Sequence, residues 1–224
     1  MAKVSLWLFD IDGTLVDTGG AGMAALQQAT EHFFGEPGPP LDLAGATDSG
    51  LVAGLFEHFG RSFGEEAFRD YCEVYLERLE WNLAHGGFTG KALPGALGVL
   101  DHLAGEADIT VGLLTGNVEA GALAKMRHYG MDHHFGFGAY GCDHADRNLL
   151  GPVALERAGR HAGRSFSPEE TLVIGDTPKD IACAAAMGAR CLAVATGAFD
   201  ATGLEGADHV AESLEDHAAW GRYL

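Results

Sequence analysis

The sequence predicts an α/β fold, a doubly wound parallel sheet that carries an inserted α-helical segment. Short apolar runs alternate with amphipathic stretches of helical length over most of the chain, while one region near the N-terminus departs from this alternation. Such alternation is typical of a parallel sheet with helices on both faces. The 224 residues, 47% of them hydrophobic, can bury a core of ordinary size, which excludes a disordered or purely linking role.

Four apolar runs end at a polar residue or a glycine, as buried parallel strands do. These predicted strands are Val4–Phe9, Ile109–Leu114, Thr171–Ile174 and Cys191–Ala195. Helices are expected over Gly95–Leu103, Val118–His128, Gly151–Gly163 and Lys179–Met187. Each of the first three strands therefore leads into a turn with polar residues, which is where α/β proteins bind ligands.

The region from Val16 to Gly87 is predicted to be a helical insert. Its apolar residues fall on helical faces over about 23–34, 51–59 and 68–83. Glycine pairs at Gly19-Gly20 and Gly86-Gly87 flank the insert; they either permit the backbone changes of a hinge or only turn the chain. The expected division is a core of residues 1–15 and 88–224 and an insert of residues 16–87.

Composition excludes several function classes. Lys plus Arg is 14 against 32 for Asp plus Glu, a formal charge of -18, so nucleic acid is not an expected partner. No stretch approaches the roughly 18 continuous apolar residues of a membrane span. The N-terminus lacks the pattern of a secretory signal, which predicts a cytoplasmic chain. The four cysteines are scattered, which argues against a zinc site.

Two aspartates follow the first predicted strand directly. They belong to the segment Asp10-Ile11-Asp12-Gly13-Thr14-Leu15. Two carboxylates this close at a strand end repel each other, and a hard cation with oxygen ligands, Mg²⁺, would relieve that repulsion. The sequence therefore predicts a magnesium site here.

Two further motifs follow the second and third predicted strands. Thr115-Gly116-Asn117 offers a hydroxyl and backbone N–H groups at a helix start, an arrangement that suits an anion, and Gly116 would let the main chain approach the ligand closely. Asp176 follows a strand and Asp180 lies on the next helix. Either motif alone could be a turn or a helix cap. Three such motifs at successive strand ends favour one shared site.

In these three motifs the chain resembles the haloacid dehalogenase superfamily, near its phosphoglycolate phosphatase-like branch. The family pattern DxDGTL is met at Asp10–Leu15, the hydrophobic-Thr-Gly-Asn motif at Thr115–Asn117, and GDxxxD at Gly175–Asp180. The insert falls where the family carries its helical cap. The resemblance covers essentially the whole chain and implies a phosphoric monoester hydrolase.

The resemblance also implies roles for these residues. Asp10 would attack phosphorus and form an aspartyl-phosphate, and Asp12 would act as general acid and then base. Mg²⁺ would be held by Asp10, the Asp12 backbone carbonyl and Asp176, with Asp180 bound directly or through water. The phosphoryl oxygens would be held by Thr115 and the N–H of Gly116 or Asn117.

One family element is missing from its usual place. Family members mostly carry a lysine between the second and last motifs, and no lysine occurs over residues 126–178. Arg147, just before a predicted helix, is the candidate replacement, with a surface ion pair to Asp143 or Asp146 as the alternative. Lys125 and Arg127 are weaker candidates because they belong to the helix that follows Asn117.

The substrate is expected to be a small phosphorylated metabolite. Phosphoglycolate would need a cation for its carboxylate, and the insert offers three arginines that look like solvated positions: Arg61, Arg69 and Arg78. Thr47 and Asp48 would either hydrogen-bond a hydroxylated substrate or cap the helix over 51–59.

Several alternatives remain within and beyond the family. A dehalogenase has no need for Asp12 or the acidic pair, and a Schiff-base hydrolase needs a cap lysine, which is absent from Val4 to Gly90. A β-phosphoglucomutase-like sugar-phosphate mutase stays open, as does a non-catalytic binding protein of this fold. The chain is expected to be a monomer or a homodimer.

Overall fold

The structure is a computed structural model that describes residues 3–224, and this part of the chain forms a six-stranded parallel sheet in the order β5-β4-β1-β6-β7-β8. The strands are β1 Leu6–Phe9, β4 Thr110–Leu114, β5 Gly138–Ala139, β6 Thr171–Gly175, β7 Arg190–Val194 and β8 His209–Ala211. The predicted α/β fold and its four central strands are confirmed. The two edge strands are only two and three residues long, too short for periodicity to reveal.

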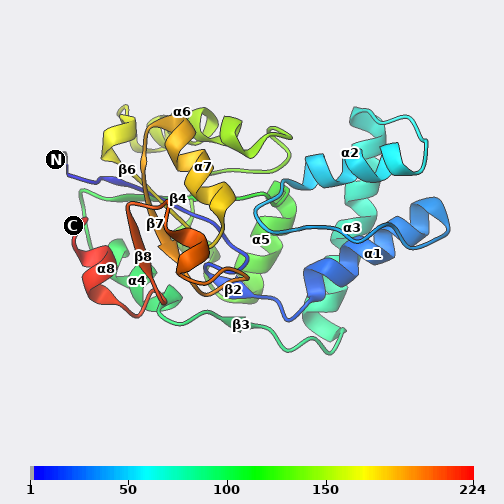
Figure 1. The fold of residues 1–224 in the computed structure, drawn as a ribbon, viewed down its shortest axis with the longest axis horizontal. Coiled ribbons are helices and arrows are strands. Elements are labelled where there is room, and N and C mark those ends of the chain that lie inside the picture. The colour runs from blue at the N-terminus through cyan, green and yellow to red at the C-terminus, as the bar shows by residue number, and fades with distance from the viewer. Residues whose placement is uncertain (1–2) are drawn as a thin grey trace.

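Helices cover both faces of this sheet (Figure 1). Trp7 and Phe9 point to the face covered by three helices, while Leu6 and Leu8 point to the other face, as alternation along a strand requires. The first face carries α4 Ala96–Ala104, α5 Glu119–His128 and α8 His217–Gly221; the second carries α6 Leu150–Ala162 and α7 Pro178–Met187. Short 3₁₀ turns occur at η1 Asp132–His134, η2 Arg147–Leu149, η3 Pro168–Glu170 and η4 Thr202–Leu204.

The insert forms three helices that project to one side of the core (Figure 1). They are α1 Ala21–Phe34, α2 Asp48–His58 and α3 Glu65–His85. Their apolar faces enclose a separate hydrophobic cluster that includes Leu26, Leu55 and Tyr71. The cluster also contains two core residues, Val118 just before α5 and Ala124 within it. The helical character of the insert is therefore confirmed, whereas its division from the core as an independent domain stays a prediction.

The two connections between insert and core lie against each other. They pair as a short antiparallel ladder, β2 Val16–Asp17 with β3 Lys91–Ala92. Gly19 has φ +63°, and a Cβ there would collide with the backbone of Thr89. Glycine is thus required by a tight turn and a close approach at this joint, and a hinge motion stays a prediction.

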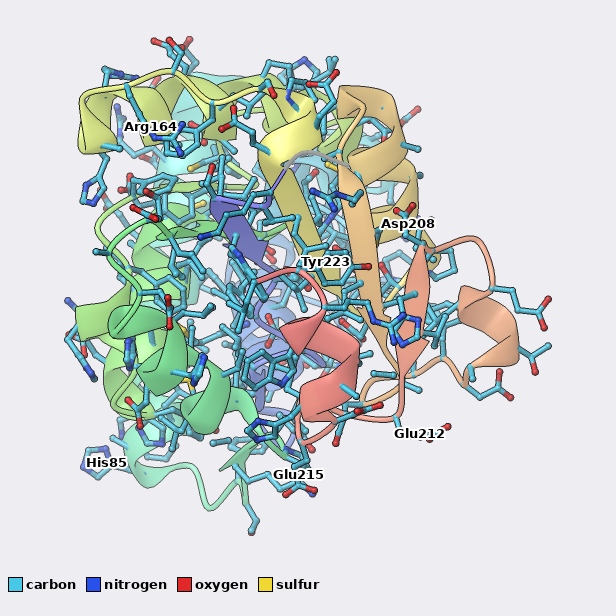
Figure 2. All side chains as sticks on the ribbon, turned by 90° about the vertical axis from the view of Figure 1, so that its left-hand side faces the viewer. His85, Arg164, Asp208, Glu212, Glu215 and Tyr223 are labelled. Atoms are coloured by element: carbon cyan, nitrogen blue, oxygen red, sulfur yellow. The ribbon has the colours of Figure 1, made fainter. Side chains whose placement is uncertain are left out.

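The acidic excess lies at the surface. Figure 2 shows Glu212 and Glu215 projecting from the segment that joins β8 to α8, and both are exposed. Among the described residues, no helix combines the length and the apolar character that crossing a bilayer requires.

Candidate active site

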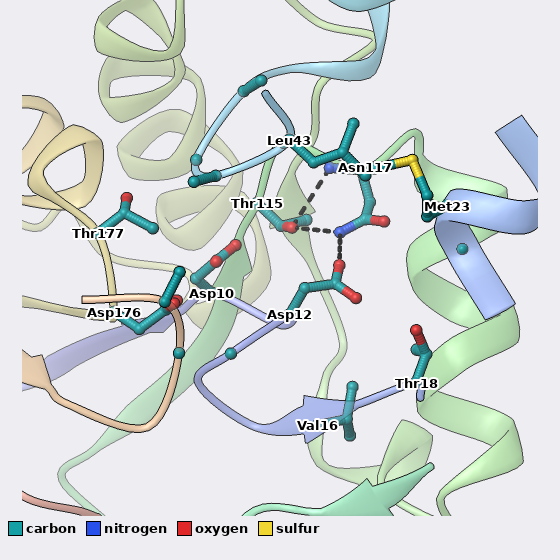
Figure 3. Close-up of a pocket in the computed structure, with 18 of the residues that line it drawn as sticks. Asp10, Asp12, Val16, Thr18, Met23, Leu43, Thr115, Asn117, Asp176 and Thr177 are labelled. Carbon is teal, nitrogen blue, oxygen red and sulfur yellow. Dashed lines mark hydrogen bonds between the residues drawn. The ribbon is translucent and has the colours of Figure 1, made fainter. Parts of the chain in front are cut away.

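Strand pairing brings the three sequence motifs to one place. Strand β1 lies between β4 and β6 and runs parallel to both, so their carboxyl ends are neighbours. Asp10, Thr115 and Asp176 directly follow these three strands and line one cavity of about 450 Å³ (Figure 3). This edge of a doubly wound sheet is the usual position of a ligand site.

Arg147 lies between two aspartates at the floor of this cavity. Its guanidinium is 3.1 Å from the Asp10 carboxylate and also forms an ion pair with Asp180. It donates to the carbonyl of Leu114 at 3.3 Å. The Arg147 side chain is 6% exposed. Burial alone would lower the pKa of Arg147, but Asp180 and Asp10 raise it well above its usual value, so this cation stays charged.

The surface alternative for Arg147 is therefore wrong. Asp143 pairs with Arg157 at 2.7 Å, and Asp146 caps the η2 turn by accepting from the N–H of Asn148 at 3.0 Å. Arg147 begins η2, close before α6, and its side chain points inward to Asp10 and Asp180. Arg147 thus lies beside Asp10, and its role as the replacement for the family lysine stays a prediction.

Asp176 stands beside Asp10 in a space that backbone geometry keeps open. A Cβ on Gly13, which has φ +83°, or on Gly197 would collide with the Asp176 carboxylate. Thr14 donates to Asp176 at 3.0 Å. Burial, and then the charges of Asp10 and Asp180, raise the pKa of Asp176 to about 8.

A divalent cation suits this donor set. Carboxylate oxygens of Asp10, Asp176 and Asp180 lie within 4.8 Å of one another. Burial raises the pKa of Asp10 to about 6, against the lowering effect of Arg147. Carboxylates that repel one another in a buried site, framed by glycines, fit a hard cation with oxygen ligands.

Asp180 is the most heavily bonded member of this group. It accepts from the backbone N–H of Thr177 at 3.0 Å and from its hydroxyl at 2.7 Å, which completes a capping box at the start of α7. Its other oxygen meets Arg147. Protein groups thus engage both carboxylate oxygens, and Asp180 positions Arg147 in addition to the metal role predicted for it.

The metal-free protein is expected to lose stability as the pH rises from about 4 to about 8. The folded-state pKa values of Asp10 and Asp176, about 6 and about 8, lie above the ordinary 3.8. The folded state therefore binds protons more tightly than the unfolded chain, and this stabilisation is complete at low pH and lost as pH rises through both values.

Thermal melts in EDTA and in Mg²⁺ at about pH 5.5 and about pH 8.5 measure this effect. The rise in Tm on adding Mg²⁺ should be larger at the higher pH, because Asp10 and Asp176 are then deprotonated and the cation neutralises their charges. The Asp176→Asn variant should show a smaller dependence on pH in EDTA. Equal Mg²⁺ increments at both pH values would contradict the assignment of this cluster.

A hydrogen-bonded chain links the second motif to Asp12 (Figure 3). The Asn117 amide donates to the Thr115 hydroxyl at 2.8 Å and to the Asp12 carboxylate at 2.8 Å. Thr115 and Asn117 are buried, while Asp12 faces the cavity with its side chain 43% exposed. The Asn117 side chain thus bridges Asp12, the predicted acid–base residue, and Thr115, whose hydroxyl is predicted to bind the phosphoryl group.

Lys125, only a weaker candidate for the missing cation on sequence grounds, lies in the site and contacts Asp12, a role that the sequence analysis did not assign to it. Its ammonium donates to both Asp12 oxygens, at 2.8 and 2.6 Å, and to the Asn117 amide oxygen at 2.6 Å. The side chain is 4% exposed, whereas that of Arg127 two positions later is 58% exposed. A signal existed: Lys125 falls on the helical face of Gly121 and Ala122, which are both buried.

The insert contacts the core through the loop before α2. The Asp48 N–H donates to the Gly116 carbonyl at 2.7 Å. A Cβ on Gly116 would collide with the Ala46 carbonyl, so the close approach that this glycine permits is to the insert loop. Gly116 also lines the cavity, as a ligand-contacting residue would.

Thr47 and Asp48 take different positions. The Thr47 hydroxyl accepts from the Gly50 N–H at 3.3 Å and donates to the Ala145 carbonyl at 2.6 Å, so it caps α2 instead of facing the cavity. Asp48 lines the cavity, and one of its oxygens accepts from the Val118 N–H at 2.8 Å. Burial raises the pKa of Asp48 to about 6. The capping interpretation holds for Thr47.

Fold and site together define the class of protein: a doubly wound α/β protein with an acidic site at the carboxyl edge of the sheet, beneath a helical insert. The chain matches the model of the haloacid dehalogenase-like hydrolases over residues 7–194. It belongs to this family.

Similar proteins include two enzymes with different names. Over 199 residues the chain is 26% identical to phosphoglycolate phosphatase 1 of Pseudomonas aeruginosa, covering 86% of this chain and 70% of that protein. It is 27% identical to the tyrosine-protein kinase PtkA of Mycobacterium tuberculosis, again over 86% of this chain but only 62% of that protein. The chain thus spans less than two thirds of the kinase.

A solved structure agrees on the fold. The structure of CbbY from Rhodobacter sphaeroides in complex with phosphate superposes with a TM-score of 0.73 at 19% identity, over 96% of each chain. The likeness extends across both the core and the helical insert, which confirms the haloacid dehalogenase fold for this chain.

Proposed function

We propose that this chain is a Mg²⁺-dependent phosphatase of small phosphomonoesters that works through an aspartyl-phosphate on Asp10. The observation that carries the proposal is the position of Asp10, a buried carboxylate at the cavity floor between the Arg147 guanidinium and Asp176. Two relatives named phosphoglycolate phosphatases, 26% and 27% identical, support the reaction class.

In the first step, an Asp10 oxygen attacks phosphorus and the bond from phosphorus to the leaving oxygen breaks. Asp12 gives its proton to that oxygen, so the alcohol leaves uncharged. Arg147 and the Thr115 hydroxyl would stabilise the negative charge on the phosphoryl oxygens. The N–H groups of Gly116 and Asn117 are further donors in reach of the same cavity.

In the second step, the Asp12 carboxylate takes a proton from water, and the water oxygen attacks phosphorus. The Asp10–phosphorus bond breaks, inorganic phosphate leaves and Asp10 is restored. Asp10, the Asp12 backbone carbonyl and Asp176 would hold Mg²⁺, with Asp180 beside them. When bound, the cation would neutralise charge between the carboxylate and the anionic phosphoryl group.

Within this mechanism Lys125 is a positioning residue for Asp12. Lys125→Met should lower kcat for an alkyl phosphate by about 10², because Asp12 then loses two of the bonds that hold its carboxylate toward the leaving oxygen. The loss should be much smaller for para-nitrophenyl phosphate, whose leaving group needs little protonation. Steady-state kinetics on both esters measure the difference.

Arg127→Met is the matched control, since Arg127 lies on the same helix but is exposed. It should leave both rates unchanged. An equal loss on the two esters in Lys125→Met would mean that Lys125 acts on something other than leaving-group protonation. Partial rescue by Lys125→Arg is expected, because a guanidinium can also bond a carboxylate.

The direct test of the proposed function is phosphate release from para-nitrophenyl phosphate with Mg²⁺ and with EDTA. Release that depends on the metal supports a phosphatase. Release that is equal in EDTA would contradict the proposed metal dependence. Absence of release with Mg²⁺ would favour a sugar-phosphate mutase or a binding protein, and isomerisation of a sugar phosphate would distinguish these two.

Other predictions complete the proposal. The partner is a small phosphorylated metabolite, and a cytoplasmic location and a monomeric or homodimeric state remain predictions. The mutase and non-catalytic alternatives gain no particular support from the site. The non-catalytic alternative depended on the unusual Arg147, and that residue lies against Asp10 where a working site would use it.

A further inference from the structure

We propose that the leaving group of the substrate is a small uncharged alcohol, apolar over most of its surface, and not a carboxylate or a second phosphate. This inference rests on the proposed phosphatase function and adds the substrate class to it. It is carried by the side chains that line the cavity beyond Asp10 and Thr115.

The insert supplies an apolar wall to this part of the cavity. Four aliphatic or thioether side chains and one aromatic ring line it: Met23, Leu26, Leu43, Leu51 and Tyr75. Figure 3 shows Met23 and Leu43 on the insert side, across the cavity from Asp10. Small-molecule sites are mostly apolar, with few polar groups that fix orientation. An apolar wall of this kind favours a leaving group with hydrocarbon surface over one that carries a charge.

The cations of the cavity are already engaged. Among the described residues that line it, Arg147 and Lys125 carry positive charge. Arg147 is bound to Asp10 and Asp180. The three donors of the Lys125 ammonium match its three bonds, two to Asp12 and one to Asn117. The Lys125 ammonium therefore has no free donor, and the Arg147 guanidinium is held beside Asp10 and Asp180. The Nε of Arg147 has no partner within residues 3–224, but it is buried and thus out of reach of a distant anionic group.

The insert arginines do not change this balance. Arg61, Arg69 and Arg78 are absent from the cavity lining within residues 3–224. Arg69 instead forms exposed ion pairs with Glu66 and Asp70. Arg61 and Arg69 are exposed, as expected, and Arg78 is half-buried. The carboxylate of a substrate such as phosphoglycolate would therefore meet none of these three cations in the cavity.

Two carboxylates complete the lining on the insert side. Asp17 and Asp48 line the cavity, and Asp48 has one oxygen bonded to the Val118 N–H. Negative charge at these positions repels an anionic leaving group. The second Asp48 oxygen could accept from a single hydroxyl of the alcohol, so one polar group is compatible with the apolar wall.

A matched pair of esters tests the inference. Phosphoglycolate and its carboxamide, phosphoglycolamide, have nearly the same shape but differ in the charge of the leaving group. The expected result is a kcat/KM at least about tenfold higher for the amide, because an unpaired carboxylate is costly to bury. Propyl phosphate should be hydrolysed at least as well as phosphoglycolate.

A gain-of-charge variant makes the test sharper. Met23→Lys places an ammonium on the apolar wall and should shift the ratio of the two kcat/KM values toward phosphoglycolate by about tenfold. Gln27→Lys is the matched control, because Gln27 lies on the same helix but is exposed. That control should leave the ratio unchanged.

The outcomes separate this inference from the function on which it rests. Equal kcat/KM values, or a preference for phosphoglycolate, would overturn the uncharged leaving group while the phosphatase stands. If no ester releases phosphate, the proposed function fails. Calorimetric binding of the same pair to Asp10→Asn in Mg²⁺ then decides the inference: tighter binding of the amide supports it, and any other result overturns it.

Discussion

Replacing Asp10 with asparagine is expected to abolish phosphate release, by about 10⁴-fold or more, as loss of a nucleophile does. The amide has the shape of the carboxylate but no charged oxygen to attack phosphorus. Its carbonyl oxygen can still accept from Arg147, which lies 3.1 Å from the Asp10 carboxylate in the wild-type chain. The fold should therefore survive.

The measurement combines turnover with thermal melting. Asp10→Asn should melt at or above the wild-type temperature in EDTA, because one of the buried, mutually repelling carboxylates is gone. Asp108→Asn is the matched control, an exposed aspartate before β4 at the opposite end of the strands, and should keep full activity. Turnover in Asp10→Asn near the wild-type rate would remove Asp10 from the nucleophile role.

Replacing Arg147 with methionine should lower both rate and stability. The rate is expected to fall by about 10² or more, the usual effect of losing one preorganised transition-state donor. The free energy of unfolding in EDTA should fall by about 3 kcal/mol or more, because Asp10 and Asp180 would be left buried without their cation. Denaturant melts and steady-state kinetics measure the two losses.

Two further variants make this result interpretable. Arg147→Lys should recover part of the rate, since the charge returns but one ammonium cannot reproduce the fork that spans both aspartates. Arg160→Met, on the exposed side of α6, should change neither quantity. A wild-type rate in a folded Arg147→Met would assign Arg147 a purely structural role.

Much of the fold could be predicted because the apolar pattern is strong where the sheet is buried. The run before Asp10 is buried on both faces as β1, and so is the strand before Asp176, while the strand before Thr115 is buried over its last three residues. The two edge strands were not predicted, because their apolar pattern is weak. Gly138–Ala139 and His209–Ala211 are too short to carry a period.

The site was predictable where residues follow strand ends directly. The proximity of three such residues depends only on the order and direction of neighbouring strands: Asp10, Thr115 and Asp176. The contact of Lys125 with Asp12 was not predicted, because Lys125 reaches Asp12 from inside a helix, and the helical face it shares with Gly121 and Ala122 was not used to orient α5 toward the cavity. The capping position of Thr47 also depends on how the insert lies against the core.

Whether phosphorus is transferred to Asp10 is the central question, and acid quenching followed by peptide mass spectrometry answers it most directly. The wild-type protein would be mixed with propyl phosphate, whose leaving alcohol is uncharged, and Mg²⁺, and quenched within the first turnovers. The expected result is one added phosphoryl group on the peptide that contains Asp10, absent from Asp10→Asn. Phosphate release without any phosphorylated peptide, or with the group on another residue, would contradict the mechanism.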